Sequence, residues 1–211
     1  MADSAGTLTA VWPQSSGSGN KDDLWASRKT DGGSWDAPPP PQLSQVSAVG
    51  DASEPHVIVD SANNITVYWL QKVVATGRID LWANRYLAAS SAWQGKVAVE
   101  DLSDSDVASP ISVLDPSTRK ITLLWRQNDS TGVQHLLVNH HDTTSWFGVR
   151  RVDGVFAHNG SSVDPNGGGP ATMVVDSSGV ITVLWLQRIN ETDGSGQPAN
   201  MQYLMANRIS F

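Results

Sequence analysis

The stretch that decides the fold runs from Pro55 to Trp93 and reads PHVIVD (55–60), ITVYWLQ (65–71) and IDLWANRYL (79–87), followed by WQG (93–95). Each segment is rich in β-branched and aromatic residues. Each is bounded by Gly, Asn, Ser or Pro, a pattern typical of strands and their turns. The stretch therefore predicts a small antiparallel sheet of four strands.

The same pattern occurs four times along the 211 residues. The motif Trp-x-Gln begins at Trp12, Trp69, Trp125 and Trp185, at steps of 57, 56 and 60 residues. A constant step of this size is typical of propellers and related arrays. We therefore predict an all-β chain, one repeat domain over 1–211, with four sheet-forming repeats at approximately 1–48, 49–106, 107–163 and 164–211.

The two outer repeats are predicted to be incomplete. The first has no room for its first strand before Asp3, and the fourth ends at Phe211 before a last strand. Open sheet edges are prone to pair with other chains. We therefore expect a homo-oligomer formed through open edges, or a chain whose ends pair with each other.

The second strand of the repeat is expected to be core. In the second repeat Ile65, Val67 and Trp69 alternate with Thr66 and Tyr68, so both faces of the strand are largely apolar. This predicts burial on both faces.

The repeat resembles a tandem repeat of bacterial secreted and cell-surface proteins, whose arrays look like β-propeller blades. The second repeat carries the resemblance best, through Asn63, Trp69, Gln71, Trp82, Ala83, Asn84, Arg85, Tyr86, Trp93 and Gly95. The third departs most, with Leu137 for the Trp and His140-His141 for Arg-Tyr. The resemblance implies a propeller-like fold and a secreted or cell-surface protein, with a cytoplasmic location left open. It implies no particular chemistry.

Composition excludes several classes of partner. The net charge is −7 and no basic cluster is present, so a nucleic acid is not an expected partner. No apolar run has the roughly 18 residues that a membrane span needs, which argues against membrane insertion. The chain has no Cys, so thiolate metal sites are not available. We expect neither a metal nor a cofactor.

The repeated Trp, Tyr, Asn, Arg and His residues are candidate ligand-binding residues. Aromatic rings stack on the apolar faces of sugars, and polar side chains hydrogen-bond to sugar hydroxyls. The candidates are Trp25, Arg28, Trp82, Asn84, Arg85, Tyr86, Trp93, Asn139, His140, Trp146, Asn207 and Arg208. They predict a lectin-like module that binds a carbohydrate or another cell-surface ligand at repeated sites.

A purely structural interpretation of the same residues stays open. The Trp of each Trp-x-Gln motif would fill the space between sheets, and the Gln would bond to loop backbone. Arg28, Arg85 and Arg208 would pair with Asp residues of the turns, namely Asp3, Asp60 and Asp176.

Catalysis is not expected. A glycosidase needs two carboxylates on either side of one bond. The three glutamates, Glu54, Glu100 and Glu191, stand at positions that pair none of them with a second acid. The alternative functions are a structural, protein-binding or oligomeric scaffold and, third, a sialidase-like glycoside hydrolase.

Overall fold

The computed structural model describes residues 1–15, 21–44, 49–100, 105–153, 162–163, 171–192, 195 and 198–211. For residues 49, 162–163, 188–192 and 198–201 it describes the backbone alone. Within these ranges the chain forms strands and turns without a helix. The described part accordingly offers no helical segment that could cross a bilayer.

The chain divides into two compact units, Met1–Glu100 and Asp101–Phe211. The first unit contains β1 (Leu8–Ser15), β2 (Asp22–Lys29), β3 (Val49–Val59), β4 (Ile65–Val73), β5 (Ile79–Leu87) and β6 (Ala92–Ala98). The second contains β7 (Val107–Leu114), β8 (Ile121–Asn128), β9 (Gln134–His141), β10 (Arg150–Arg151), β11 (Ser162–Val163), β12 (Thr172–Val175), β13 (Ile181–Thr192) and β14 (Pro198–Ile209). The strands expected in the second repeat are all present.

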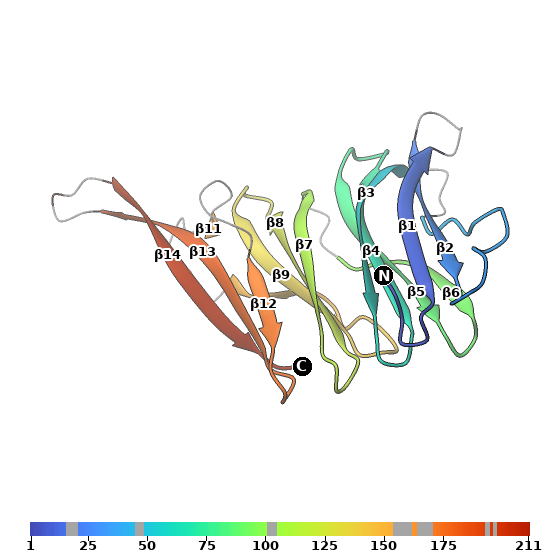
Figure 1. Cartoon of the computed structure of the whole chain (residues 1–211). Helices are drawn as coiled ribbons and strands as arrows, with labels where there is room; N and C mark the ends of the chain where they lie inside the picture. Colours follow the sequence, from blue (N-terminus) through green and yellow to red (C-terminus); the bar gives the residue numbers. More distant parts are fainter. Residues whose placement is uncertain are drawn as a thin grey trace. The chain divides into compact units, whose positions relative to one another are not determined.

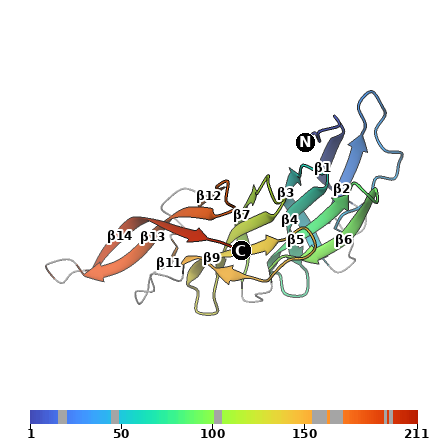
Figure 2. The ribbon, with the colours of Figure 1, turned by 90° about the horizontal axis from the view of Figure 1, so that it is seen from below.

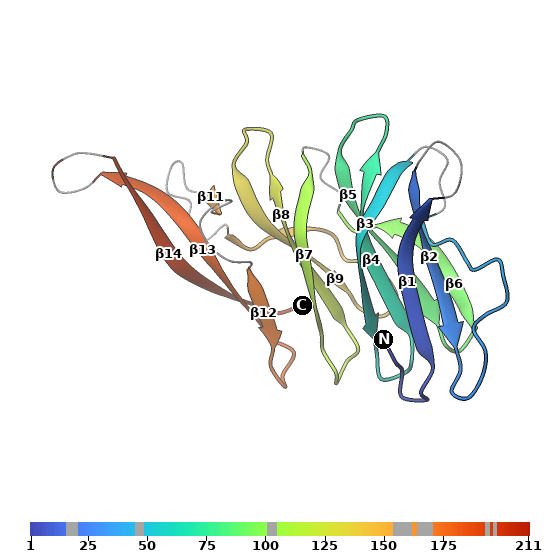
Figure 3. The ribbon, with the colours of Figure 1, turned by 45° about the horizontal axis from the view of Figure 1, so that its top comes forward.

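These strands form four small antiparallel sheets, two in each unit. The first unit has the pair β1-β2 and the sheet β3-β4-β5-β6, whose strands lie side by side in Figure 1. The second unit has the sheet β10-β9-β8-β7 and a sheet in which β13 pairs with β11, β12 and β14 (Figure 3). The all-β prediction with four sheets is confirmed. Because β11 pairs with β13, the fourth sheet begins before the expected boundary at residue 164.

The first and fourth sheets differ from the two regular four-stranded sheets. In the described residues, the first sheet consists of β1 and β2, and isolated bridges from Trp25 to Gln42 and from Lys29 to Trp35 follow the edge of β2. The fourth sheet ends with β14. Among the described residues, the first sheet is therefore two-stranded, and the fourth consists of the four strands β11, β12, β13 and β14.

The core of each unit lies between its two sheets. In the first unit, Leu24 and Ala26 of β2 pack in one apolar cluster with Val67 and Trp69 of β4. All seven residues 65–71 are buried, which confirms the expected burial of this strand on both faces. On one of these faces, Val67 and Trp69 pack against Leu24 and Ala26 of the neighbouring sheet.

The Trp-x-Gln motif is a hydrogen-bonded unit. Residues two apart on a strand point to the same face, so the Trp indole N–H can donate to the Gln side-chain oxygen. The bond measures 2.8, 3.1, 3.1 and 3.0 Å in the four repeats, from Trp12, Trp69, Trp125 and Trp185 respectively. Trp12 is only partly buried, because β1 is an edge strand, whereas the other three indoles are fully enclosed.

The Gln side chain also hydrogen-bonds to the backbone of the neighbouring segment where strand pairing is irregular. The pairing of β3 with β4 shifts register between Val49 and Ala52, which takes the carbonyl of Gly50 out of the ladder. Gln71 Nε2 donates to that carbonyl at 3.2 Å, and Gln127 donates to the carbonyl of Ser105 at 2.9 Å. The expected bond from Gln to loop backbone is confirmed for these two repeats.

Candidate functional site

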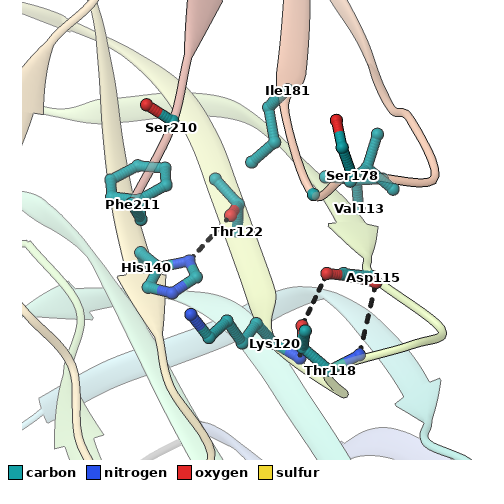
Figure 4. A pocket seen from close by; sticks show the side chains of 12 residues that line it. Val113, Asp115, Thr118, Lys120, Thr122, His140, Ser178, Ile181, Ser210 and Phe211 are labelled. Atoms are coloured by element: carbon teal, nitrogen blue, oxygen red, sulfur yellow. Dashed lines mark hydrogen bonds between the residues drawn. The ribbon is translucent and has the colours of Figure 1, made fainter.

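A pocket lies between the third and fourth sheets, within the second unit. Its volume is about 100 Å³, enough for a few water molecules or one edge of a larger ligand. It is lined by Val113, Asp115, Thr118, Lys120, Thr122, His140, Val175, Ser178, Gly179, Ile181, Ser210 and Phe211. Figure 4 shows the labelled side chains converging from β7, β8, β9 and β13, from the turns after β7 and β12, and from the segment after β14. The C terminus accordingly lies next to β9 (Figure 2).

Asp115 supplies the negative charge of the pocket. Its carboxylate accepts hydrogen bonds from the hydroxyls of Ser117 and Thr118, both at 2.6 Å, and from their backbone N–H groups. Burial raises the pKa of the Asp115 carboxyl, but these hydrogen bonds outweigh burial and lower the pKa to about 2. Asp115 is therefore an anion at any physiological pH.

A glycine allows the opposite wall to approach this carboxylate. A Cβ atom at Gly179 would lie 3.2 Å from Asp115 Oδ2, and Gly179 has a φ of +80°. A side chain at this position would meet both the carboxylate and an unfavourable backbone conformation. Gly179 therefore keeps the space beside Asp115 open.

His140 is the most unusual group in the pocket. Its Nδ1 lies 3.1 Å from the Thr122 hydroxyl, and its ring stacks on Phe211 at 4.4 Å between centroids. Nε2 is buried and makes no hydrogen bond within the described part of the chain. Burial lowers the pKa of the His140 ring and the charge of Lys120 lowers it further, so the ring is neutral at pH 7. A buried ring nitrogen without a partner is costly unless a ligand or water satisfies it.

The pocket is close to electrically neutral. Lys120 supplies one positive charge, and Figure 4 shows its side chain pointing toward the His140 ring. Asp115 supplies one negative charge, while His140 supplies none. The hydroxyls of Thr118, Ser178 and Ser210 and the ring of Phe211 complete the lining. The arrangement therefore favours an uncharged polar ligand with hydroxyl groups.

The pocket exists where the third repeat departs from the others. In the other three repeats, an Arg at the position of His140 pairs with the turn Asp. The pairs are Arg28–Asp3 at 3.5 Å, Arg85–Asp60 at 3.5 Å and Arg208–Asp176 at 3.0 Å. The expected pairs of the three arginines with the turn Asp residues are therefore present. Imidazole is shorter than an arginine side chain, so His140 leaves room beside Asp115.

Two of the three predicted Asn residues connect neighbouring repeats, and the third bonds within its own repeat. Asn84 Nδ2 donates to the carbonyl of Leu43 at 3.4 Å, and Asn84 Oδ1 accepts the N–H of Gly95 at 3.1 Å. Asn207 makes the corresponding bond to the carbonyl of residue 152 at 2.8 Å, and Asn139 accepts the N–H of residue 148 at 3.1 Å. Asn84 thus links the first sheet to the second, and Asn207 links the third to the fourth.

The predicted aromatic residues of the second repeat contact side chains of their own repeat and of the first. The Lys96 ammonium lies 4.1 Å from the centroid of the Trp82 ring. Tyr86 meets Trp93 edge to face at 5.5 Å, and Arg28 covers the Tyr86 ring at 4.0 Å. Neighbouring side chains thus already contact the rings of Trp82 and Tyr86.

The remaining predicted residues lie apart from the pocket. Trp25 is half-buried on β2, and its indole donates to the carbonyl of Gln14 at 3.3 Å. Trp146 meets His141 edge to face at 5.1 Å. Of the twelve predicted binding residues, His140 is the one that lines the pocket.

Sequence reasoning missed most of the pocket. Asp115, Lys120, Ser178 and Phe211 lie in turns or after the last strand, where their residue types are ordinary. The replacement of the repeated Arg by His140 was the one signal that pointed to this place. At His140 the third repeat loses the Arg–Asp pair that the other three repeats form.

A second polar cluster, around His135, is fully paired within itself. His135 Nδ1 lies 2.9 Å from Asp153, and Nε2 lies 3.0 Å from Asp129. Arg151 pairs with Asp153 at 3.0 Å. In the part of the chain that the structure describes, no group of three or more side chains is arranged to hold a metal ion. The cluster therefore ties β9 to the adjoining segments.

Comparison with known proteins defines the class of the fold. No protein-family model matches the chain, and no curated protein is similar in sequence. A crystal structure described as a protein of unknown function from Dyadobacter fermentans DSM 18053 is similar, with a TM-score of 0.56 and 11% identity. The similarity covers 94% of this chain and 65% of that one, so this chain spans about two thirds of its length. At this identity the likeness concerns the fold alone.

A second solved structure is less similar. An endo-arabinase from Bacteroides thetaiotaomicron VPI-5482 gives a TM-score of 0.43 at 11% identity, over 100% of this chain and 73% of that one. A score this low supports no argument about fold or activity. The class that the fold defines is an all-β protein of four small antiparallel sheets.

Proposed function

We propose that the protein is a non-catalytic carbohydrate-binding module that holds one edge of an uncharged sugar in the pocket beside His140. The observation that carries the proposal is the buried Nε2 of His140, which lacks a hydrogen-bond partner among the described residues. When the neighbouring Lys120 side chain moves aside, a sugar hydroxyl can donate to this nitrogen or accept from it, whichever tautomer the ring adopts.

The rest of the lining suits the same ligand. The Asp115 carboxylate accepts hydrogen bonds, Lys120 donates them, and the hydroxyls of Ser178 and Ser210 do both. One positive and one negative charge balance, which disfavours a ligand with a net charge. A cavity of about 100 Å³ takes an edge of a sugar rather than a whole oligosaccharide.

The chemistry of the pocket argues against hydrolysis. The pocket is lined by one side-chain carboxylate, that of Asp115, and glycoside cleavage uses two. Asp115 has a pKa of about 2, so it carries no proton that a general acid could deliver at neutral pH. Binding without catalysis is the function that this lining supports best.

The wider setting of the proposal comes from the sequence. The repeat resembles those of bacterial secreted and cell-surface proteins, and such a location gives access to glycans. We further propose that the four sheets serve as propeller-like blades. An assembly scaffold is the second candidate function, because apolar side chains on both outer sheets are open to solvent.

The test is a glycan array probed with the wild-type chain and with His140→Arg. This substitution restores the residue of the other repeats, so we expect it to pair with Asp115 and fill the pocket. We expect binding to neutral glycans that His140→Arg weakens at least tenfold, while its thermal unfolding temperature stays unchanged or rises. His56→Arg, at an exposed position in the first unit, is the matched control and should bind like wild type.

Two results would overturn the proposal. One is that the wild type binds no glycan on the array, and the other is that wild type and His140→Arg bind equally. Preference for acidic glycans would contradict the uncharged class of ligand. If the chain binds no glycan and self-associates, the assembly scaffold would be the better-supported function.

A further inference from the structure

The two interfaces within the units are built alike. In the first unit, the face of β2 that carries Leu24 and Ala26 packs against the face of β4 that carries Trp69. In the second unit, Val138 of β9 packs in the same way with Trp185 of β13. Each interface joins a face with small and branched residues on one sheet to a face with a large indole on the next.

The first sheet presents an indole face that is partly exposed. We call Leu8, Ala10, Trp12 and Trp25 the Trp12 face. They occupy in β1 and β2 the places that Ile65, Val67, Trp69 and Trp82 occupy in β4 and β5. Leu8 is 42% exposed, and Trp12 and Trp25 are half-buried, whereas Ile65, Val67 and Trp69 are fully buried.

The fourth sheet presents the complementary kind of face. We call Val174, Leu184, Leu204 and Ala206 the Leu204 face. Leu204 and Ala206 occupy the places of Leu24 and Ala26, which are fully buried in the first unit. Here Leu204 is 73% exposed and Val174 is 62% exposed. Large apolar side chains that lie together on a surface mark a contact site.

We propose that the Trp12 face of one copy packs against the Leu204 face of a second copy and reproduces the interface between the sheets of one unit. The occupant is a second copy because the chain itself carries both halves of an interface that it forms twice internally. The contact joins two different surfaces, so it is heterologous and produces rings or open chains of copies. This inference is independent of the pocket at His140.

One position at this contact is poorly matched. In the first unit the Arg28 guanidinium stacks on Tyr86. Between copies, Arg208 takes the place of Arg28, and Lys29 takes the place of Tyr86. Two like charges meet there, which weakens the contact. Lys29→Tyr removes the repulsion and restores the stacking ring, so it should tighten association roughly tenfold.

The test mixes two variants that each lack one face. Leu8→Asp disrupts the Trp12 face, and Leu204→Asp disrupts the Leu204 face; both positions are exposed, so the fold should tolerate the change. Val97→Asp, at another exposed apolar position, is the matched control. Masses are measured by light scattering after size exclusion, over a range of concentrations, and compared with multiples of 22.6 kDa.

The expected results are specific to head-to-tail contact. Wild type and Val97→Asp should form concentration-dependent oligomers, and each face variant alone should be a monomer. The mixture of Leu8→Asp with Leu204→Asp should give a dimer, because one intact face of each kind remains. A monomeric wild type would overturn the proposal, as would self-association of either face variant alone or a mixture that stays monomeric.

Discussion

The indole N–H of Trp69 donates a 3.1 Å hydrogen bond to the side-chain oxygen of Gln71, two residues further along β4. The amide nitrogen of Gln71 donates in turn to the carbonyl of Gly50 on β3. One side chain therefore satisfies a buried donor on its own strand and a buried acceptor on the next. The same pair of bonds is present at Trp125 and Gln127 in the third repeat.

Replacing Gln71 by Met should destabilise the first unit by about 3 kcal/mol, because it leaves the Trp69 N–H and the Gly50 carbonyl buried without partners. Gln14→Met is the matched control, since Gln14 is exposed, and it should change stability by less than about 0.5 kcal/mol. Urea unfolding followed by tryptophan fluorescence measures both. Equal effects of the two substitutions would contradict the role assigned to Gln71.

Two of the repeated Arg–Asp pairs should differ in their contribution to stability. The side chains of Arg85 and Asp60 are 8% and 1% exposed, whereas those of Arg208 and Asp176 are 66% and 42% exposed. Arg85→Met leaves a buried carboxylate without its cation, so it should cost about 3 kcal/mol. Arg208→Met should cost less than about 1 kcal/mol. Similar losses in denaturant unfolding would show that burial does not decide the strength of these bridges.

Much of the fold could be predicted from the sequence because a repeat displays its pattern several times. The alternation of Ile65, Val67 and Trp69, and the turn residues between strands, identified β4 and its neighbours. The Arg–Asp bridges followed from the recurrence of both residues at one spacing. The Arg and Asp residues recur together because each Arg side chain pairs with the Asp of a turn in its own repeat.

The pocket could not be predicted in the same way, because it depends on a single copy. Asp115 and Ser178 come from turns of different repeats, and Phe211 follows the last strand. Their proximity results from the packing of two sheets, which no local pattern encodes. His140 stood out in the sequence, but only the three-dimensional structure shows that its Nε2 has no hydrogen-bond partner among the described residues.

The stability of the second unit should fall as pH is lowered below about 6.5, the ordinary pKa of histidine. Burial, Lys120 and Arg150 lower the pKa of folded His140, while Asp142 and Asp115 oppose the shift. Below pH 6.5 the unfolded chain therefore binds a proton at His140 more readily than the folded chain does. The contribution of neutral His140 to the free energy of unfolding is complete above pH 6.5 and is lost on acidification. The measurement is urea unfolding at pH 7.5 and 5.5. His140→Gln should show a smaller loss than wild type, and an equal loss would contradict the assignment.

Thr118→Val should raise the pKa of Asp115 from about 2 toward its ordinary value. The substitution removes the 2.6 Å hydrogen bond from the Thr118 hydroxyl but keeps the size of the side chain and the bond from Ser117. A carboxyl ¹³C titration by nuclear magnetic resonance measures the shift. Thr144→Val, which removes the equivalent bond to Asp142, is the control and should leave Asp115 unchanged. An unchanged pKa in Thr118→Val would mean that this hydroxyl does not stabilise the carboxylate.

The most direct test of the central claim observes the ring nitrogen on which it depends. Long-range ¹H–¹⁵N spectra of the histidine rings should be recorded while the neutral saccharide that binds best is titrated into the wild-type chain. We expect the Nε2 resonance of His140 to shift as the saccharide saturates the protein, while the ring of His56 stays unchanged. Saturable binding that leaves His140 Nε2 unmoved would place the sugar elsewhere and contradict the account.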